Sequence, residues 1–173
     1  MKLWIRGEAE YSPCKRYRYT LTRTMNADLV GDDARTIAFI GLNPSTATAT
    51  TDDPTVRRCI GYAARDGFGR FVMLNAFGYR ATDPKDMKAI AEPVGEGNDA
   101  AIARVAADAD LVVLAWGAHG THLSRHDAVL RLLDGLCEPV CLGVTKAGLP
   151  RHPLYLRADA PFVAFDDGGV VGV

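Results

Sequence analysis

Four apolar stretches, each followed by a small polar cluster, constrain the fold of this chain more than any other feature. They are TIAFIGLNPS at 36–45, RFVMLNAFGYR at 70–80, DLVVLAWGAHG at 110–120 and EPVCLGVTKAGLPRHP at 138–153. Runs of this kind are typical of strands buried on both faces of a parallel sheet. The carboxyl ends of parallel strands meet at one edge of an open α/β sheet, and ligands bind at that edge. We therefore expect the chemistry of the protein to lie there, on Asn43, Asn75, Arg80, His119, Lys146 and His152.

The segments between these stretches carry helix signals. Residues 54–64 repeat apolar side chains at helical spacing, and a proline stands at the first position of that repeat. Further helices are predicted to start at Pro84 and to cover residues 98–107 and 125–136. The alternation of strands and helices predicts the α/β class, with a three-layer α/β/α sandwich around a central, mostly parallel sheet.

Shorter signals predict the borders of the sheet. Residues 17–25 alternate like an exposed edge strand, and the segments PLYL at 153–156 and FVAF at 162–165 are typical of small edge strands. Residues 166–173 are expected to form a frayed tail. Because the chain shows no linker and no internal repeat, we predict a single domain over residues 1–173.

Composition narrows the classes of function. The chain has 173 residues, of which 48% are hydrophobic, so one ordinary domain can bury a core. Its formal net charge of -1 lacks the basic excess of tight, nonspecific nucleic-acid binders. Four cysteines without a signal peptide indicate a reducing compartment, and we expect a cytoplasmic protein. No apolar run approaches the roughly 20 residues of a membrane span, so a membrane role is not expected.

Five stretches carry a resemblance that extends over nearly the whole chain. They are GLNPSTATATTDDPTVRRC, LNAFGYRATDP, GNDAA, AWGAHG and PRHPLYL. Together they resemble the bacterial and phage domain-of-unknown-function family numbered 1643, which implies no established activity.

The same landmarks, in the same order, are similar to the uracil-DNA glycosylase superfamily. GLNPS resembles the GINPG motif of mismatch-type uracil and thymine glycosylases, and LAWGAHG resembles their LLWG strand followed by a small residue. LNA at 74–76 is similar to the strand whose asparagine contacts the uracil edge, and RHPLYL occupies the place of the HPSPLS loop. The resemblance implies a glycosylase-like fold and a nucleobase, nucleotide or DNA as the partner.

The chain departs from that pattern in two places. The segment STATATTDD after Pro44 lacks the aromatic residue that stacks on the extruded base in the glycosylases, so Phe77 or Tyr79 would have to supply the ring. The last loop has Leu154 and Tyr155 where the glycosylases have serines. Either side chain could insert into a base stack.

The chemistry of N-glycosidic bond cleavage suits the residues at this sheet edge. The reaction places positive charge on the sugar and negative charge on the departing base. Asn43 would orient the attacking water, and His152 would donate a hydrogen bond to the oxygen that becomes negative. Asn75 has a donor and an acceptor for a pyrimidine-like edge. Such an enzyme needs neither a metal nor an organic cofactor.

Charged residues near the first polar cluster have two interpretations each. Asp52 could act as a general base or bind a cation, or could be a solvated loop acid. Asp53, directly before a proline, has the pattern of a helix N-cap. Arg57 and Arg58, in the first turns of the predicted helix, could contact phosphate or face the solvent.

The remaining candidates are also open to alternatives. Asn75 could tie down a neighbouring loop instead of binding a ligand, and Arg80 could hold an anion or pair with a nearby aspartate. Lys146 could act as a nucleophile, contact phosphate or be an exposed loop lysine. His119 at the third strand end and Arg151 beside His152 are candidate substrate contacts.

Three histidines, His119, His122 and His126, have spacings of three and four that a helix would place on one side. Gly120 interrupts that helix, and the segment lacks a clear set of further ligands, so no metal site is predicted.

Three hypotheses from different classes follow. The first is a glycosylase-like enzyme acting on a nucleobase in DNA or in a nucleotide, with Asn43, Asn75 and His152 at its centre. The second is a non-catalytic module that binds a nucleotide or nucleic acid. The third is a metal-dependent hydrolase built from Asp52 and the histidines.

Overall fold

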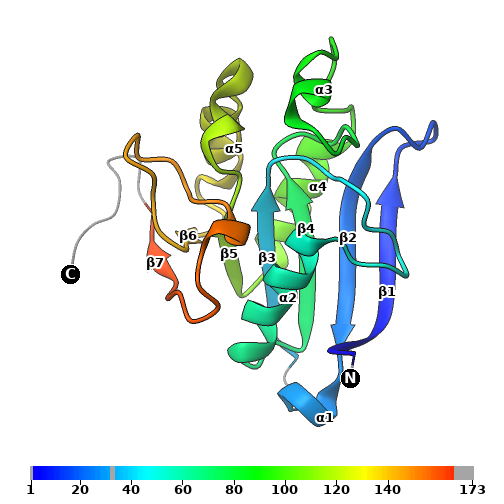
Figure 1. Ribbon diagram of the computed structural model, residues 1–173, viewed down its shortest axis with the longest axis vertical. Coiled ribbons are helices and arrows are strands. Elements are labelled where there is room, and N and C mark those ends of the chain that lie inside the picture. Colours follow the sequence, from blue (N-terminus) through cyan, green and yellow to red (C-terminus); the bar gives the residue numbers. More distant parts are fainter. Residues whose placement is uncertain (1, 32–33, 166–173) are drawn as a thin grey trace.

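The computed structural model describes residues 2–31 and 34–165. In these ranges, seven strands form one sheet in the order β1-β2-β4-β3-β5-β6-β7 (Figure 1). Their bounds are β1 Trp4–Tyr11, β2 Arg18–Met25, β3 Thr36–Gly41, β4 Arg70–Asn75, β5 Leu111–Leu114, β6 Val140–Cys141 and β7 Val163–Ala164. Strands β4, β3, β5 and β6 are parallel, whereas β1, β2 and β7 pair in the antiparallel sense. The α/β class is therefore confirmed.

The expectation of a mostly parallel sheet is wrong, because the strands at both borders of the sheet are antiparallel to their neighbours. Among the described strands, three pairings are parallel and three are antiparallel. The hairpin β1-β2 joins β4 on one side, and β7 returns along β6 on the other. Residues 17–25 do form a strand, but β2 lies inside the sheet because β1 covers it. Strand β1 was not predicted, because the charged residues Arg6, Glu8 and Glu10 stand at every second position and leave no continuous apolar run.

Helices cover both faces of the sheet. They are α1 Ala27–Val30, α2 Pro54–Arg65, α3 Pro84–Lys88, α4 Asn98–Asp108 and α5 Arg125–Leu133, with short 3-10 helices η1 Ala118–Ser124 and η2 Pro153–Tyr155. Along β3, Phe39 packs on the side of α2, and Ile40 packs on the side of α4 and α5. A strand covered on both faces must be apolar at every position, which explains the uninterrupted runs in the sequence.

The predicted first residues of the helices are confirmed. Asp53 caps α2, because its Oδ1 accepts from the Val56 N–H at 2.9 Å, and Asp83 caps α3 in the same way. Helix α5 begins at Arg125 as predicted but ends at Leu133, before the expected 136.

The two short strands predicted near the C-terminal end are confirmed in part. The prediction of a strand at PLYL is wrong, since Pro153 has no N–H for a sheet ladder and the segment forms η2. The segment FVAF contains β7, and the predicted tail at 166–173 lies outside the described residues.

The order of the elements opens a crevice at the carboxyl ends of the central strands. From β3 the chain passes through α2 on one face to β4, and from β4 through α4 on the other face to β5 (Figure 1). Strands β4 and β5 are the two neighbours of β3, so the connections diverge there. A divergence of this kind leaves the strand ends uncovered for a ligand. No helix in the described ranges is long and apolar enough to cross a membrane.

Candidate functional site

A cavity of about 670 Å³ lies at the carboxyl ends of β3, β4 and β5. This volume falls in the range of small-molecule sites. Asn43, Asn75 and His152 all line it, although they are far apart in the sequence. Other polar side chains of its wall include those of Arg18, Asp53, His119, Thr145 and Arg151.

Asn43 follows β3 by two residues, and its amide is fixed by the backbone. Its Nδ2 donates to the Ala81 carbonyl at 2.7 Å and to the Pro44 carbonyl at 3.1 Å. Because the nitrogen is committed in this way, the Oδ1 atom is the part of the amide left to accept a hydrogen bond from a ligand or water.

Asn75 ends β4 and is 1% exposed. Its Nδ2 has no hydrogen-bond partner among the described residues, which is unusual for a buried amide. The side chain needs Gly41 on the adjacent strand, because a Cβ there would lie 2.9 Å from Asn75 Oδ1. The Asn75 backbone carbonyl is held separately by Asn98 Nδ2 at 2.9 Å. The side chain is thus available to a ligand, whereas the backbone is fixed.

His152 closes the cavity from the far side of β5. It caps η2, and its Nδ1 accepts from the Leu154 N–H at 3.3 Å. That bond leaves the imidazole proton on Nε2 in the neutral ring. Burial lowers the pKa of His152 below its usual value, and the negative charge of Asp53 opposes this shift. His152 is therefore a neutral donor at physiological pH.

The backbone at the end of β5 is shaped to admit this histidine. Gly117 has a φ of 72°, and a Cβ there would approach His152 Cβ to 3.3 Å. Its N–H donates to the Pro150 carbonyl at 2.9 Å. A side chain at this position would combine backbone strain with crowding of the histidine.

Residues 156–162, which we call the strap, run from the His152 loop alongside α2 to β7 (Figure 1). Tyr62 donates its hydroxyl to the Arg157 carbonyl at 2.7 Å, and Arg65 Nη1 donates to the Ala160 carbonyl at 2.7 Å. Phe162 packs against the rings of Phe39 and Tyr62. The helix thereby holds the loop that carries His152.

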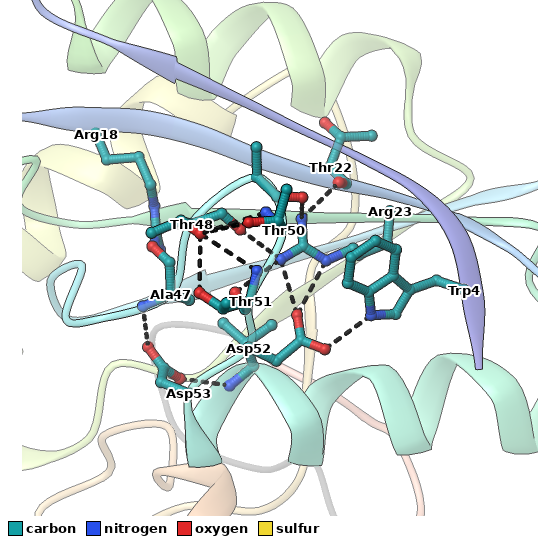
Figure 2. Close-up of polar contacts among 12 residues, drawn as sticks. Trp4, Arg18, Thr22, Arg23, Ala47, Thr48, Thr50, Thr51, Asp52 and Asp53 are labelled. Carbon is teal, nitrogen blue, oxygen red and sulfur yellow. Dashed lines mark hydrogen bonds and ion pairs between the residues drawn. The ribbon is translucent and has the colours of Figure 1, made fainter. Parts of the chain in front are cut away.

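The structure separates the two adjacent aspartates of the first loop (Figure 2). Asp52 turns away from the cavity: its Oδ1 accepts from Arg23 Nε at 3.0 Å and Nη2 at 2.8 Å, and its Oδ2 accepts from Trp4 Nε1 at 2.7 Å. Asp53 lines the cavity while it caps α2. The carboxylate in the cavity wall is therefore that of Asp53. The prediction that Asp53 caps the helix is confirmed.

Arg23 is the anchor of the loop at 47–53. Its guanidinium is fully buried and donates to the carbonyls of Thr48 at 2.7 Å, Thr51 at 3.1 Å and Ala49 at 3.3 Å. A loop rich in threonine and alanine has few large side chains with which to hold itself, so this arginine fixes its course (Figure 2).

The predicted aromatic contacts do not reach the cavity. Phe77 is in the core, with its ring 5.6 Å from that of His122. Tyr79 packs edge-on against Tyr17 and lines, together with Arg80, a second cavity of about 400 Å³. Two other rings do line the main cavity, those of Trp116 and Tyr155.

The remaining predicted contacts divide between the cavity and the surface. His119, whose Nδ1 lies 2.9 Å from Lys88 Nζ, and Arg151 both line the cavity. Arg57 and Arg58 line a separate cavity of about 570 Å³ beside α2. Lys146 is exposed, and it is its neighbour Thr145 that lines the main cavity.

Sequence reasoning did not identify Arg18 and Trp116 as residues of the cavity wall. Trp116 is buried in the core and also lines the cavity. Arg18 lies inside a strand segment, YRYTL, whose alternation indicates only a half-buried strand. No local signal distinguishes it from an ordinary strand residue, because its place at the cavity depends on the pairing of β2 with β4.

No group of three or more histidine, cysteine or acidic side chains is arranged for a metal ion in the ranges that the structure covers. The three histidines of the 119–126 segment are separated by the kink in η1, where His122 and Leu123 leave helical geometry.

Among known proteins, the chain matches one family model. No curated protein and no solved structure matches the chain. A family model described as a protein of unknown function (DUF1643) matches residues 18–154, from the start of β2 to η2, and so includes Asn43, Asn75 and His152 of the cavity wall. The chain belongs to this family.

Proposed function

We propose that the cavity binds a nucleobase and that the protein cleaves an N-glycosidic bond to it. The observation that carries the proposal is the presence of Asn43, Asn75 and His152 in the wall of one cavity that is large enough for a nucleotide. The same three residues are those that the glycosylase resemblance and the chemistry of the reaction select.

Each of the three side chains has a group suited to one part of the reaction. Asn75 pairs its amide with the edge of the base, since its Nδ2 lacks a protein partner. Asn43 positions a water through Oδ1, because its nitrogen is held by backbone carbonyls. His152 donates from Nε2 to the base oxygen that gains negative charge as the bond breaks.

Asp53 completes the set. In the proposed step, the water oxygen bonds to the anomeric carbon and the C–N electron pair leaves with the base. Asp53, which lines the cavity, takes the proton that the water loses. Its two oxygens already accept from the Ala47 N–H at 3.3 Å and the Val56 N–H at 2.9 Å, and these bonds fix its orientation.

A ring for stacking on the base is available at the mouth of the cavity. Tyr155 is 86% exposed, lines the cavity and has its ring 5.6 Å from that of His152. An exposed ring beside a polar site provides a π-face that tolerates different bases. Tyr155 therefore takes the place expected for Phe77 or Tyr79.

The test is a base-release assay. Oligonucleotides that contain uracil, hydroxymethyluracil or a mismatch, and the corresponding free nucleotides, are incubated with the protein, and abasic sites and free base are measured. His152→Ala and Asp53→Asn should each lower the rate by about 100-fold or more, and Asn is as good an N-cap as Asp. His122→Ala is the matched control, because His122 does not line the cavity.

The alternative is a module that binds a base without cleaving it. It would be supported if no base is released from any substrate, while a base or nucleotide binds saturably and Asn75→Ala abolishes that binding. The third hypothesis, a hydrolase that uses Asp52 and a metal, lacks a supporting arrangement in the described ranges, since both oxygens of Asp52 are committed to Arg23 and Trp4.

A further inference from the structure

Arg18, the first residue of β2, carries a buried cation into the wall of the cavity. The residue is 1% exposed and is one of the residues that line the cavity. Within the described ranges, the single hydrogen bond of its guanidinium runs from Nη1 to the Ala47 carbonyl at 2.7 Å. Its Nε is buried and has no partner there. A guanidinium has five N–H donors, so most of the binding capacity of this group is unused.

The other two buried arginines of the described chain differ sharply from Arg18. Arg23 bonds to four backbone carbonyls and pairs with Asp52 (Figure 2). Arg125 pairs with Asp99, and its Nε donates to the Ala76 carbonyl at 2.6 Å. Buried charges in proteins are normally compensated in this manner. Arg18 is the exception, and it is the one of the three that lies at the cavity.

The nearest acid does not neutralise Arg18 by direct contact. Asp53 raises the pKa of Arg18 through its charge, but no ion pair joins the two groups in the described structure, and the Asp53 oxygens accept from backbone N–H groups. Asp53 also caps α2, so the positive end of that helix offsets part of its charge. Burial lowers the pKa of Arg18 to about 10, which still leaves the guanidinium charged at neutral pH.

Further donors surround the cavity. Asn75 Nδ2 is buried in its wall without a partner, and the neutral ring of His152 carries its proton on Nε2 because Nδ1 accepts from Leu154. Trp116 Nε1 also lacks a partner but faces Gly120, where a Cβ would lie 2.8 Å from it. A wall that offers a cation and several N–H groups suits a ligand rich in oxygen acceptors.

We propose that the Arg18 end of the cavity is an oxyanion site, which binds a phosphate or carboxylate group of a small ligand. The choice of ligand rests on the proposed function. If the cavity binds a nucleobase, the site selects an anionic nucleotide or base, such as a nucleoside 5′-monophosphate, over an uncharged nucleoside. The anion supplies the acceptors that Arg18 lacks.

Calorimetric titration with four probes tests the site. Uridine is the neutral probe, uridine 5′-monophosphate and inorganic phosphate represent phosphate, and orotate represents a carboxylate on the base. At least one anionic probe should bind wild-type protein about tenfold more tightly than uridine, or more. In Arg18→Gln, whose amide can still donate to the Ala47 carbonyl, this preference should disappear. Whether the phosphate probes or orotate show the preference distinguishes the two sources of the anion.

Arg131→Gln is the control, since Arg131 is exposed on α5 and does not line the cavity. It should keep the preference for the anion. Loss of the preference in Arg151→Gln, an exposed residue of the cavity wall, but not in Arg18→Gln would overturn the inference, as would equal binding of uridine and all anionic probes to the wild-type protein.

A measurement on the wild-type protein covers the case in which Arg18→Gln does not fold. The Arg18 Nε–H resonance should shift saturably when inorganic phosphate or orotate is added, and an unmoved resonance during saturable anion binding would refute the site. These readouts do not depend on base release. Anion binding at Arg18 without any glycosidic cleavage would therefore refute the proposed function alone, and cleavage without anion preference would refute the oxyanion site alone.

Discussion

At the scale of single residues, the first loop shows how two adjacent carboxylates acquire different tasks. Asp52 is bonded to Arg23 and Trp4, whereas Asp53 lines the cavity and caps α2. The side chains of neighbouring loop residues point in different directions, and only the surrounding strands decide which direction leads to the ligand. Asp53 has a recognisable cap pattern, but its position in the cavity wall depends on β2, which is distant in sequence.

Removal of the Asp52 carboxylate should destabilise the fold. Arg23 has a fully buried side chain and Asp52 a side chain that is 14% exposed, so Asp52→Ala leaves a buried cation without its counter-ion. We expect the free energy of unfolding to fall by about 3 kcal/mol, measured by chemical denaturation. Asp66→Ala removes the acid of an exposed pair with Arg65 and should lower it by less than about 1 kcal/mol. Equal effects of the two substitutions would contradict a buried anchor at Arg23.

The imidazole of His152 should make the stability of the protein depend on pH. Its pKa in the folded protein is lowered by burial, so the unfolded chain takes up a proton first as the pH falls below about 6.5. The stabilisation by the neutral ring is complete above that pH and is lost as the pH falls through the lowered pKa of the folded state. The difference in unfolding free energy between wild type and His152→Gln should therefore shrink from pH 7.5 to pH 5. A difference that grows over this range would show a raised pKa.

At the scale of elements, the cavity is closed by the contact between the strap and α2. Tyr62 and Arg65 hold the backbone of residues 157–160, so a helix that connects two strands also positions the histidine of a loop after β6. The amphipathic pattern of 54–64 predicts the helix and its buried face. It does not predict the bond of Tyr62, because the partner carbonyl lies 95 residues away.

Tyr62→Phe should loosen the His152 loop without disrupting the core. The ring stays packed against Phe39, and the loss of one hydrogen bond lowers the free energy of unfolding by about 1 kcal/mol. Amide hydrogens of residues 152–160 should exchange faster than in the wild type. Tyr17→Phe removes a similar bond, from the hydroxyl to the Glu92 carbonyl, and should leave exchange at 152–160 unchanged. Unaltered exchange in Tyr62→Phe would show that the strap is held by packing alone.

At the scale of the whole molecule, the sequence predicts what depends on local pattern and misses what depends on distant pairing. Runs of apolar residues mark β3, β4 and β5, and the polar residues after them mark Asn43 and Asn75, because parallel strands bring their ends together. The hairpin β1-β2 supplies Arg18 and Arg23, and its place beside β4 follows from no local signal. The buried cation of the cavity was therefore beyond sequence reasoning, although the edge that carries it was not.

A ligand in the cavity should therefore join segments that are remote in sequence. The wall combines residues 41–46 and 53–56, from the segment between β3 and α2, with residues 116–119 after β5 and 151–155 after β6. At a ligand concentration of about 100 times the Kd, opening that requires ligand release is suppressed about 100-fold. Hydrogen exchange with uridine 5′-monophosphate should thus slow in all of these segments together, while β1 at the sheet edge keeps its rate. Protection confined to residues 15–16 and 79–80, which line the second cavity but not the main one, would place the ligand outside the main cavity.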